Sequence, residues 1–252
     1  MKEAAPRPGR FAVAWQFLTV IPLFPAGKLD DRDLARAMGA FPAVGLALGA
    51  GLVAFHLVLG RALPGLLEGA IAVALLAAAT GCFHLDGLAD TADGLSGGWT
   101  RERALEIMKD SRTGAVGAAA LCLAVVALAA GYGLLPPGVR WAGFLVTPAA
   151  GRAAAVWLAR RSPYARPEGG LGRPYSEHLT DGEVLQAALW AGAPAVVFLG
   201  VPGLLALAFT WVWAEGLRHY FLRRLGGVTG DVLGFCEVTS EIVFLVFLHA
   251  LT

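Results

Sequence analysis

The sequence has few charged residues and no marked excess of either sign. Charged residues make up 15% of the 252 positions, and the formal net charge is +1. This balance argues against a nucleic-acid-binding protein, because such proteins need a basic surface that displaces counterions from phosphates. Hydrophobic residues make up 57% of the chain and the mean hydropathy is +0.64, so the composition is typical of a membrane protein.

Cysteine is equally scarce. The three cysteines, Cys82, Cys122 and Cys236, are isolated from one another and lie in or beside apolar runs. This distribution predicts neither a disulfide framework nor a zinc site, and it favours small side chains packed among apolar neighbours.

A cleavable signal sequence and internal repeats are not evident either. The N-terminal segment MKEAAPRPGR is polar and rich in proline, and the apolar stretch 11–24 that follows is short and ends in prolines. We interpret this stretch as an interfacial or re-entrant piece. No repeat or linker divides the chain, so residues 1–252 are expected to form one domain, with 1–37 as a cytoplasmic or interfacial N-terminal segment.

Long apolar runs are abundant, and several approach the ~20 residues that a membrane-spanning helix needs. The pattern predicts an all-α, polytopic helical bundle with about seven transmembrane helices. The predicted spans are 38–59, 65–83, 114–135, 140–159, 184–201, 203–222 and 232–251. A soluble all-α protein with an unusually apolar core is the alternative.

The basic residues are distributed unevenly among the predicted connections. Seventeen of the twenty Lys and Arg residues lie on one side of the predicted membrane, two lie on the other, and Arg152 lies within a span. Because Lys and Arg collect on the cytoplasmic side, this side is predicted to be cytoplasmic in a cell (inner) membrane. The acidic clusters of the chain lie on the same side.

The acidic stretch HLDGLADTADGLSGG follows the second predicted span. Asp86, Asp90 and Asp93 are spaced i, i+4 and i+7, so a helix would present all three on one face. Because like charges repel, a cation is their natural partner, and carboxylates favour a hard ion such as Mg²⁺. The alternative is a solvated helix with capping aspartates.

His84 is a candidate general base or metal ligand, or else a hydrogen-bonded structural group.

A candidate phosphate-binding site lies in MKDSRTGAVG, at the start of the third predicted span. A helix N-terminus presents free N–H groups, Gly114 lets an anion approach, and Arg112 and Lys109 are basic. Asp110 is a further candidate metal ligand. An ordinary helix cap with close helix packing is the alternative.

Further ionisable residues lie in or near the later spans. Glu237 and Glu241 are four residues apart in the last predicted span, which opens near Asp231. Carboxylates at that depth are functional candidates, and Arg152 is available to pair with one of them or with a substrate phosphate. A structural ion pair is the alternative. Arg166 belongs to a basic, aromatic stretch, SPYARPEGGLGRPYSEH, that suits a nucleotide or a lipid headgroup.

Two of these stretches resemble a known family. HLDGLADTADGLSGG followed by RALEIMKDSRTGAVG is similar to the signature of the cobalamin synthase family, the adenosylcobinamide-GDP ribazoletransferases. SPYARPEGGLG and GGVTGDVLGFCEVTSE follow in the order of that family, and the resemblance spans roughly residues 11–247. The chain departs from the family at QFLTVIP, which lacks an Arg often present after the Thr, and at Phe235-Cys236-Glu237, where small or amide residues are common.

The resemblance implies an integral membrane enzyme of the late corrin pathway. Such an enzyme joins adenosylcobinamide-GDP to α-ribazole or its 5′-phosphate, releases GMP, and yields adenosylcobalamin or its 5′-phosphate with Mg²⁺ as cofactor. The predicted ligands of the ion are Asp86, Asp90, Asp93 and Asp110.

In the mechanism that follows from this reading, the ribazole 3′-hydroxyl attacks the phosphorus nearer the corrinoid. Arg112 and Lys109 would hold the departing GMP, and either a carboxylate or His84 would take the hydroxyl proton. The residues expected to bind substrate or phosphate are Lys109, Arg112, Gly114, Arg152, Arg166, Asp231, Glu237 and Glu241.

Two other functions remain open. One is a Mg²⁺-dependent membrane CDP-alcohol phosphotransferase or prenyltransferase. The other is a cation-coupled transporter, which is disfavoured because most acidic residues lie on one side and no inverted repeat is visible. Membrane lipid is an expected partner and nucleic acid is not, and the sequence leaves open whether the protein forms a homo-oligomer.

Overall fold

The computed structural model describes residues 9–23, 30–166, 168–169 and 173–252, without the side chains of residues 176 and 177. Much of the predicted N-terminal segment, residues 1–8 and 24–29, therefore lies outside the described part. The described residues form helices and one isolated bridge between Tyr164 and Val228, so the all-α prediction is confirmed. The helices are α1 (Arg10–Leu18), α2 (Asp31–Ala37), η1 (Met38–Ala40), α3 (Phe41–Val58), η2 (Gly60–Ala62), α4 (Gly65–Thr80), α5 (Phe83–Gly97), α6 (Arg101–Ile107), α7 (Ala115–Gly133), α8 (Pro137–Arg160), α9 (Arg173–His178), α10 (Asp181–Leu225) and α11 (Gly230–Leu251).

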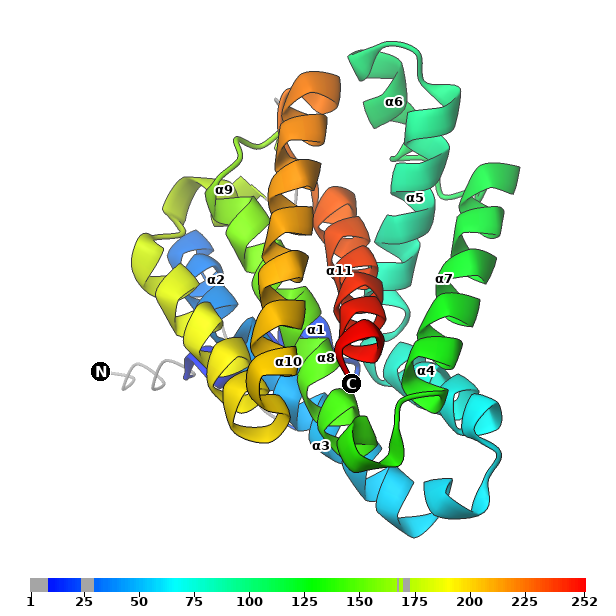
Figure 1. Cartoon of the computed structure of the whole chain (residues 1–252). Helices are drawn as coiled ribbons and strands as arrows, with labels where there is room; N and C mark the ends of the chain where they lie inside the picture. Colours follow the sequence, from blue (N-terminus) through cyan, green and yellow to red (C-terminus); the bar gives the residue numbers. More distant parts are fainter. Residues whose placement is uncertain (1–8, 24–29, 167, 170–172) are drawn as a thin grey trace.

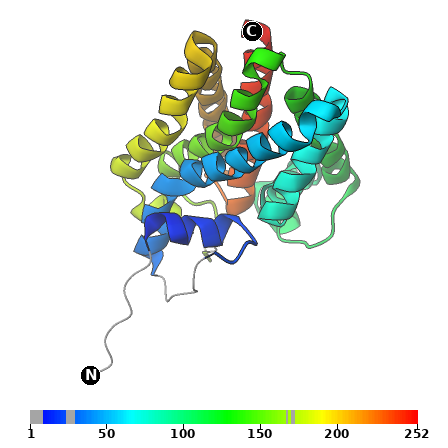
Figure 2. The same cartoon turned by 90° about the horizontal axis from the view of Figure 1, so that it is seen from below.

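Helix α8 lies at the centre of the bundle (Figures 1 and 2), where it packs against α3, α10 and α11. Its middle, LVTPAAGRAAAVWLA, is rich in small residues, so neighbouring backbones can approach closely. A Cβ atom at Gly45 of α3 would lie 2.5 Å from the carbonyl oxygen of Pro148, and one at Gly49 would lie 2.8 Å from that of Phe144. Glycine at these two positions is therefore what allows α3 to contact α8.

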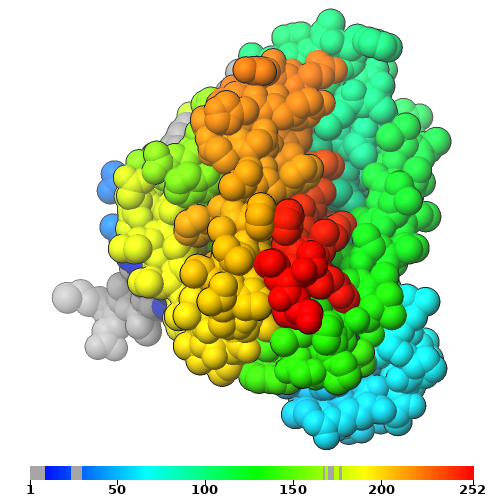
Figure 3. Space-filling model, viewed as in Figure 1, coloured from blue at the N-terminus to red at the C-terminus, as the bar shows by residue number. Residues whose placement is uncertain are grey.

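The outward surface of the bundle is apolar, as expected for a protein surrounded by lipid. Figure 3 shows α7, α10 and α11 forming much of one outer face. Large apolar side chains on these helices are exposed, among them Leu123, Val126, Val197 and Val212. Such side chains would be costly in water and are favourable against acyl chains.

The number of membrane spans differs from the predicted seven. Five described helical segments are long and apolar enough to cross a membrane, or six if the bent pair α4 and α5 forms one span. The protein is thus a multi-pass membrane bundle, and the count of seven is not confirmed. The predicted spans 184–201 and 203–222 both lie in α10, a single helical element of 45 residues.

Helix α10 leaves the helical conformation at Gly200, where φ is 61° and ψ is −141°. These dihedrals are accessible to glycine and strongly disfavoured for residues with a side chain. The chain reverses direction at this point (Figure 1), and a Cβ atom at Gly203 would lie 2.5 Å from the Leu199 Cβ. The two halves of α10 therefore pack against each other beside α8.

A sharp bend between α4 and α5 positions the acidic stretch. Gly81 and Cys82 both have φ of 60°, which ends α4 and starts α5 at an angle of 94°. Cys82 is the one described non-glycine residue with positive φ, an uncommon conformation for a residue with a side chain. Residues 83–97, which contain the three aspartates at helical spacing, form a regular helix beyond this bend.

The connections that are rich in basic residues meet at one end of the bundle. Arg101 donates a 2.8 Å hydrogen bond to the Ala165 carbonyl oxygen, and Arg224 donates to the Gly98 carbonyl oxygen. The bridge between Tyr164 and Val228 lies at the same end. The sequence reading placed these connections on one side of the membrane, and the structure brings them into contact.

Candidate active site

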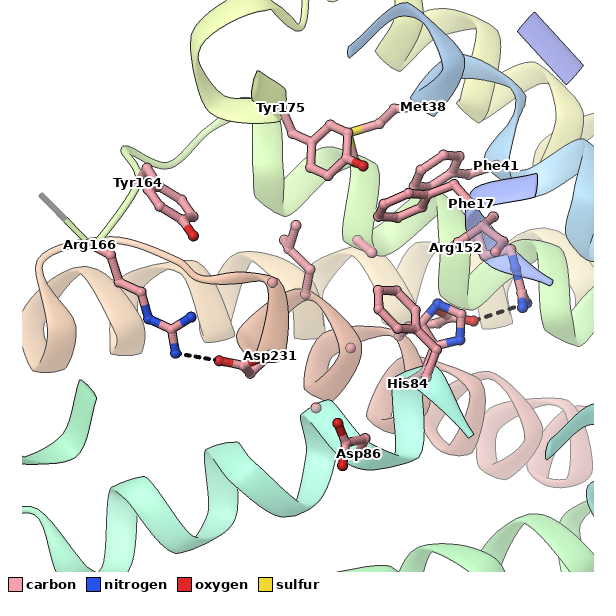
Figure 4. Close-up of a pocket in the computed structure, with 18 residues that line it drawn as sticks. Phe17, Met38, Phe41, His84, Asp86, Arg152, Tyr164, Arg166, Tyr175 and Asp231 are labelled. Atoms are coloured by element: carbon pink, nitrogen blue, oxygen red, sulfur yellow. Dashed lines mark hydrogen bonds and ion pairs between the residues drawn. The ribbon is translucent and has the colours of Figure 1, made fainter. Parts of the chain in front are cut away.

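A cavity of about 180 Å³ opens beside α5 and α11 (Figure 4) and is also lined by residues of α1, α3, α8 and α9. Six residues that the sequence reading selected as site residues line it, and all six have ionisable side chains. They are His84, Asp86, Arg152, Arg166, Asp231 and Glu237. Residues separated by more than 150 positions in the chain therefore share one pocket.

Close packing of α5 on α11 brings the acidic residues together. A Cβ atom at Gly87 would lie 2.8 Å from the Asp231 carbonyl oxygen, and one at Gly234 would lie 3.2 Å from the His84 carbonyl oxygen. Each helix thus offers a glycine where the other one approaches. As a result, Asp86 from α5 and Asp231 from α11 face the same cavity.

The carboxylates of this cluster are incompletely neutralised by protein groups. Asp231 accepts a 2.7 Å hydrogen bond from Arg166, whereas Asp86 and Asp90 form no ion pair with any described residue. Asp90 nevertheless interacts electrostatically with Asp86, Asp231 and Asp93. An excess of negative charge in one place favours a bound cation.

A second polar group is buried beneath the cavity. One nitrogen of Arg152 lies 3.0 Å from a Glu237 carboxylate oxygen and 3.6 Å from a Glu241 oxygen, and it donates to the Pro148 carbonyl oxygen at 2.8 Å. The other oxygen of Glu237 contacts His84 Nε2. Arg152, Glu237 and Glu241 are only 2%, 3% and 6% exposed. These four residues form a network that we call the Arg152 network.

The Arg152 network also separates two cavities. His84, Arg152 and Glu237 line the main cavity and a smaller one of about 40 Å³ among α4, α5, α7 and α11. The Arg152 Nε atom is buried without a hydrogen-bond partner among the described residues. Arg152 therefore forms the structural ion pair that the sequence reading gave as one alternative and also lines the cavity, while its contact with a substrate phosphate stays a prediction.

The predicted phosphate-binding residues of the α6–α7 connection lie outside this cavity. Lys109 pairs with Glu168, and Arg112 holds Asp110 through hydrogen bonds of 2.6 and 3.0 Å. The Arg112 guanidinium lowers the pKa of the Asp110 carboxyl to about 2. In this conformation Arg112 binds a protein carboxylate, and Asp110 is not brought to the other aspartates.

Asp93 occupies the helix N-terminus at which a phosphate was expected. Its two carboxylate oxygens accept hydrogen bonds from the backbone N–H groups of Gly114, at 2.6 Å, and Gly117, at 2.7 Å. The N-terminal end of α7 is therefore capped by a side chain from α5. A Cβ atom at Gly117 would lie 2.9 Å from the Ala89 carbonyl oxygen, so this glycine allows the contact.

We expect Asp93→Ala to lower the free energy of unfolding by about 1–2 kcal/mol, because two N–H groups of α7 lose a charged acceptor. Thermal unfolding in detergent measures this change, with Glu102→Ala on the exposed surface of α6 as the control. An unchanged melting temperature would show that the cap does not stabilise the protein.

The cavity has an aromatic side, of which the sequence reading missed the phenylalanines but not the tyrosines, since Tyr164 and Tyr175 lie in the selected stretch SPYARPEGGLGRPYSEH. Phe17, Phe41 and Phe83 line it together with Tyr164 and Tyr175. Phe17 lies in the stretch interpreted as interfacial, and Phe41 lies in a predicted span, so nothing in their local sequence marks them as pocket residues. The one available signal is that Phe83 directly precedes His84.

No group of three or more His, Cys, Asp or Glu side chains is arranged as a ready-made metal cage in the part of the chain that the structure describes. The carboxylates nearest the cavity are nevertheless hard oxygen donors that lack competing soft ligands, since the three cysteines are isolated from one another.

Comparison with known proteins decides the family. The model of the cobalamin-5-phosphate synthase family matches residues 10–249. The chain belongs to the cobalamin-5-phosphate synthase family. The resemblance that the motifs indicated is thus confirmed, and it covers nearly the whole chain.

Relatives of this synthase family align over most of their length. A protein of Syntrophobacter fumaroxidans is 41% identical over 93% of this chain and 96% of its own. One of Geotalea daltonii is 37% identical over 96% and 97%, and one of Klebsiella pneumoniae is 41% identical over 94% and 98%. Each is named adenosylcobinamide-GDP ribazoletransferase. No solved structure matches the chain.

Proposed function

We propose that this protein is an adenosylcobinamide-GDP ribazoletransferase that joins adenosylcobinamide-GDP to α-ribazole or its 5′-phosphate and releases GMP. The names of its relatives support this activity. The observation that carries the proposal is the pocket in which Asp86 and Asp231 lie close to His84. Carboxylates next to a candidate base are what transfer between a diphosphate and a hydroxyl requires. No observation favours the alternative functions, which were a CDP-alcohol phosphotransferase, a prenyltransferase and a cation-coupled transporter.

The donor set of the pocket fits Mg²⁺. This ion is usually held by one or two carboxylates and completes its octahedron with water and substrate phosphate oxygens, so a full protein cage is not needed. Asp86 and Asp231, which line the pocket, would hold it together with Asp90, which does not line the pocket but interacts electrostatically with both. Both oxygens of Asp93 and of Asp110 already accept hydrogen bonds, which makes these two residues weaker candidates. Bound Mg²⁺ would supply neutralisation of the diphosphate charge.

His84 is the proposed general base. Glu237 contacts Nε2 of the ring, so a proton on Nε2 leaves the Nδ1 lone pair free. The ribazole 3′-hydroxyl would form a bond to the phosphorus nearer the corrinoid while its proton moves to Nδ1 and the bond from that phosphorus to the GMP oxygen breaks. Arg152 would fix Glu237, and through it the orientation of the imidazole. Arg166 would bind phosphate oxygens next to Asp231.

We further propose that the pocket faces the cytoplasm from the inner membrane. The connections that contain most Lys and Arg residues meet at this end of the bundle, and such residues collect on the cytoplasmic side. Nucleotides and Mg²⁺ are available there.

A transfer assay tests the proposal. Purified protein in lipid nanodiscs, supplied with adenosylcobinamide-GDP, α-ribazole and Mg²⁺, is expected to release one GMP for each corrinoid joined, as measured by chromatography and mass spectrometry. Removal of the metal with EDTA should abolish the release, and added Mg²⁺ should restore it. Absence of GMP under these conditions would contradict the transferase proposal. Full activity in EDTA would contradict the proposal of a bound metal.

A further inference from the structure

The aromatic side of the cavity is an organised cluster, which we call the aromatic wall. It consists of Phe17, Phe41, Phe83 and Tyr175. Phe17 stacks on Phe41 with ring centroids 5.8 Å apart and an interplanar angle of 14°. Phe83 and Tyr175 present their edges to Phe17 at 5.5 and 5.6 Å.

The four rings come from α5 and from α1, α3 and α9, which are separate in sequence. Figure 4 shows Tyr175 and Phe41 across the pocket from Asp86. Since the rings border a cavity, part of the wall is free to contact a ligand.

The hydroxyl group of Tyr175 is not satisfied by the protein. Tyr175 is 3% exposed, lines the cavity, and its Oη has no hydrogen-bond partner among the described residues. Burial also raises the pKa of this phenol, so the group stays neutral and able to donate. A buried hydroxyl without a partner is unfavourable, and a ligand with a polar atom at its edge would satisfy it.

The wall is suited to a flat, mainly apolar ring. Its members offer π faces and edges, and the one polar atom that they contribute is Tyr175 Oη. A guanine base carries several donors and acceptors on its edge, and burying them against this wall would leave most unpaired. A benzimidazole has few polar atoms and stacks well on aromatic side chains.

The position of the wall relative to His84 identifies the substrate whose base it would bind. Phe83 immediately precedes His84, and the two ring centroids are 5.2 Å apart. In a nucleoside, the base and the 3′-hydroxyl are attached to the same ribose. An acceptor whose 3′-hydroxyl hydrogen-bonds to His84 therefore has its base within reach of the wall. The guanine of the donor is separated from the attacked phosphorus by a second phosphate and a ribose, which directs it away from His84.

We propose that the aromatic wall binds the bicyclic base of the acceptor nucleoside, with Tyr175 Oη hydrogen-bonding to the base or its ribose. This inference rests on the proposed transferase activity, and it assigns the acceptor-binding part of the same pocket to aromatic residues of which only Tyr175 lies in a stretch that the sequence reading selected. The opposite part of the pocket, with Asp86, Asp231 and Arg166, is left for the diphosphate of the donor.

Two conservative variants test the wall. Phe41→Leu keeps an apolar side chain while it removes the ring, and Tyr175→Phe removes only the hydroxyl. We expect Phe41→Leu to raise the KM for α-ribazole about tenfold, and Tyr175→Phe to raise it about threefold, with the KM for adenosylcobinamide-GDP unchanged. Phe209→Leu is the matched control, because Phe209 stacks on Phe247 at the lipid-facing surface, away from the cavity.

Several outcomes separate this inference from the proposed function. Equilibrium binding of α-ribazole without donor should weaken in Phe41→Leu by the same factor as the KM rises, and it is measurable even if no GMP is released. If the wild-type protein is active and both variants keep the wild-type KM for α-ribazole, the wall does not bind the acceptor. The same conclusion follows if the variants raise the KM for adenosylcobinamide-GDP instead. If the wild-type protein binds α-ribazole, Phe41→Leu does not, and the wild type releases no GMP, the transferase proposal fails while the proposed binding role of the wall stands.

Discussion

Asp86→Asn is expected to lower the rate of GMP release by a factor of at least about 10²–10³. The substitution keeps the size of the side chain and removes the charge that would hold Mg²⁺ at the diphosphate. Loss of one electrostatic contact to a developing charge typically costs this much in kcat. Because Asp86 lies near the carboxylates of Asp90 and Asp231 and forms no ion pair with a described residue, the same change should leave the melting temperature equal or slightly higher, even though Arg166 pairs with Asp231.

The measurement pairs GMP release with thermal unfolding in the same nanodiscs. Glu106→Gln is the control, since Glu106 is an exposed carboxylate on α6 that pairs with Arg103. Asp90→Asn should behave like Asp86→Asn. A variant at Asp86 that keeps more than a tenth of the wild-type rate would remove this residue from the metal site.

Arg152→Leu is expected to lower the free energy of unfolding by about 3–5 kcal/mol. The substitution leaves Glu237 and Glu241 buried without their guanidinium, and an uncompensated buried charge is among the costliest defects in a protein. Arg103→Leu removes an exposed ion pair with Glu106 and should change stability by less than ~1 kcal/mol.

A combined variant separates charge from packing. Adding Glu237→Gln and Glu241→Gln to Arg152→Leu should recover much of the lost stability, because no charge of the network then remains unpaired. Thermal and denaturant unfolding measure the recovery, while GMP release should stay low because His84 has lost the carboxylate that orients it. Equal melting temperatures for Arg152→Leu and the wild type would mean that the two carboxylates do not depend on Arg152.

The sequence predicts features that depend on local spacing. Apolar runs are sufficient to predict the helical membrane bundle, and the i, i+4, i+7 spacing predicts the helix that carries Asp86, Asp90 and Asp93. The different roles of these aspartates are not visible in the spacing. Asp93 caps α7, a contact that depends on where α7 begins relative to α5.

Contacts between distant segments were beyond the sequence reading. Asp231 reaches Asp86 because Gly87 and Gly234 let two helices approach, and no periodicity encodes this pairing. Arg112 was expected to bind phosphate because its type and position suit that task, yet the nearer Asp110 holds it in this conformation. The number of spans differed because the sequence divides this region into two spans, 184–201 and 203–222, whereas the structure contains one helical element, α10, that is interrupted only at Gly200.

The bend at Gly81 and Cys82 has a consequence for how the two substrates are aligned. Phe83, His84 and Asp86 all belong to the first turn of α5, directly after two residues with left-handed dihedrals. One turn of α5 thus carries the ring of Phe83, which is proposed to contact the acceptor's benzimidazole, the proposed proton acceptor His84, and the candidate metal ligand Asp86. Any rotation about this pair of peptides would move all three side chains together, so the ring proposed to contact the acceptor, the proposed proton acceptor and the proposed metal ligand keep their positions relative to one another.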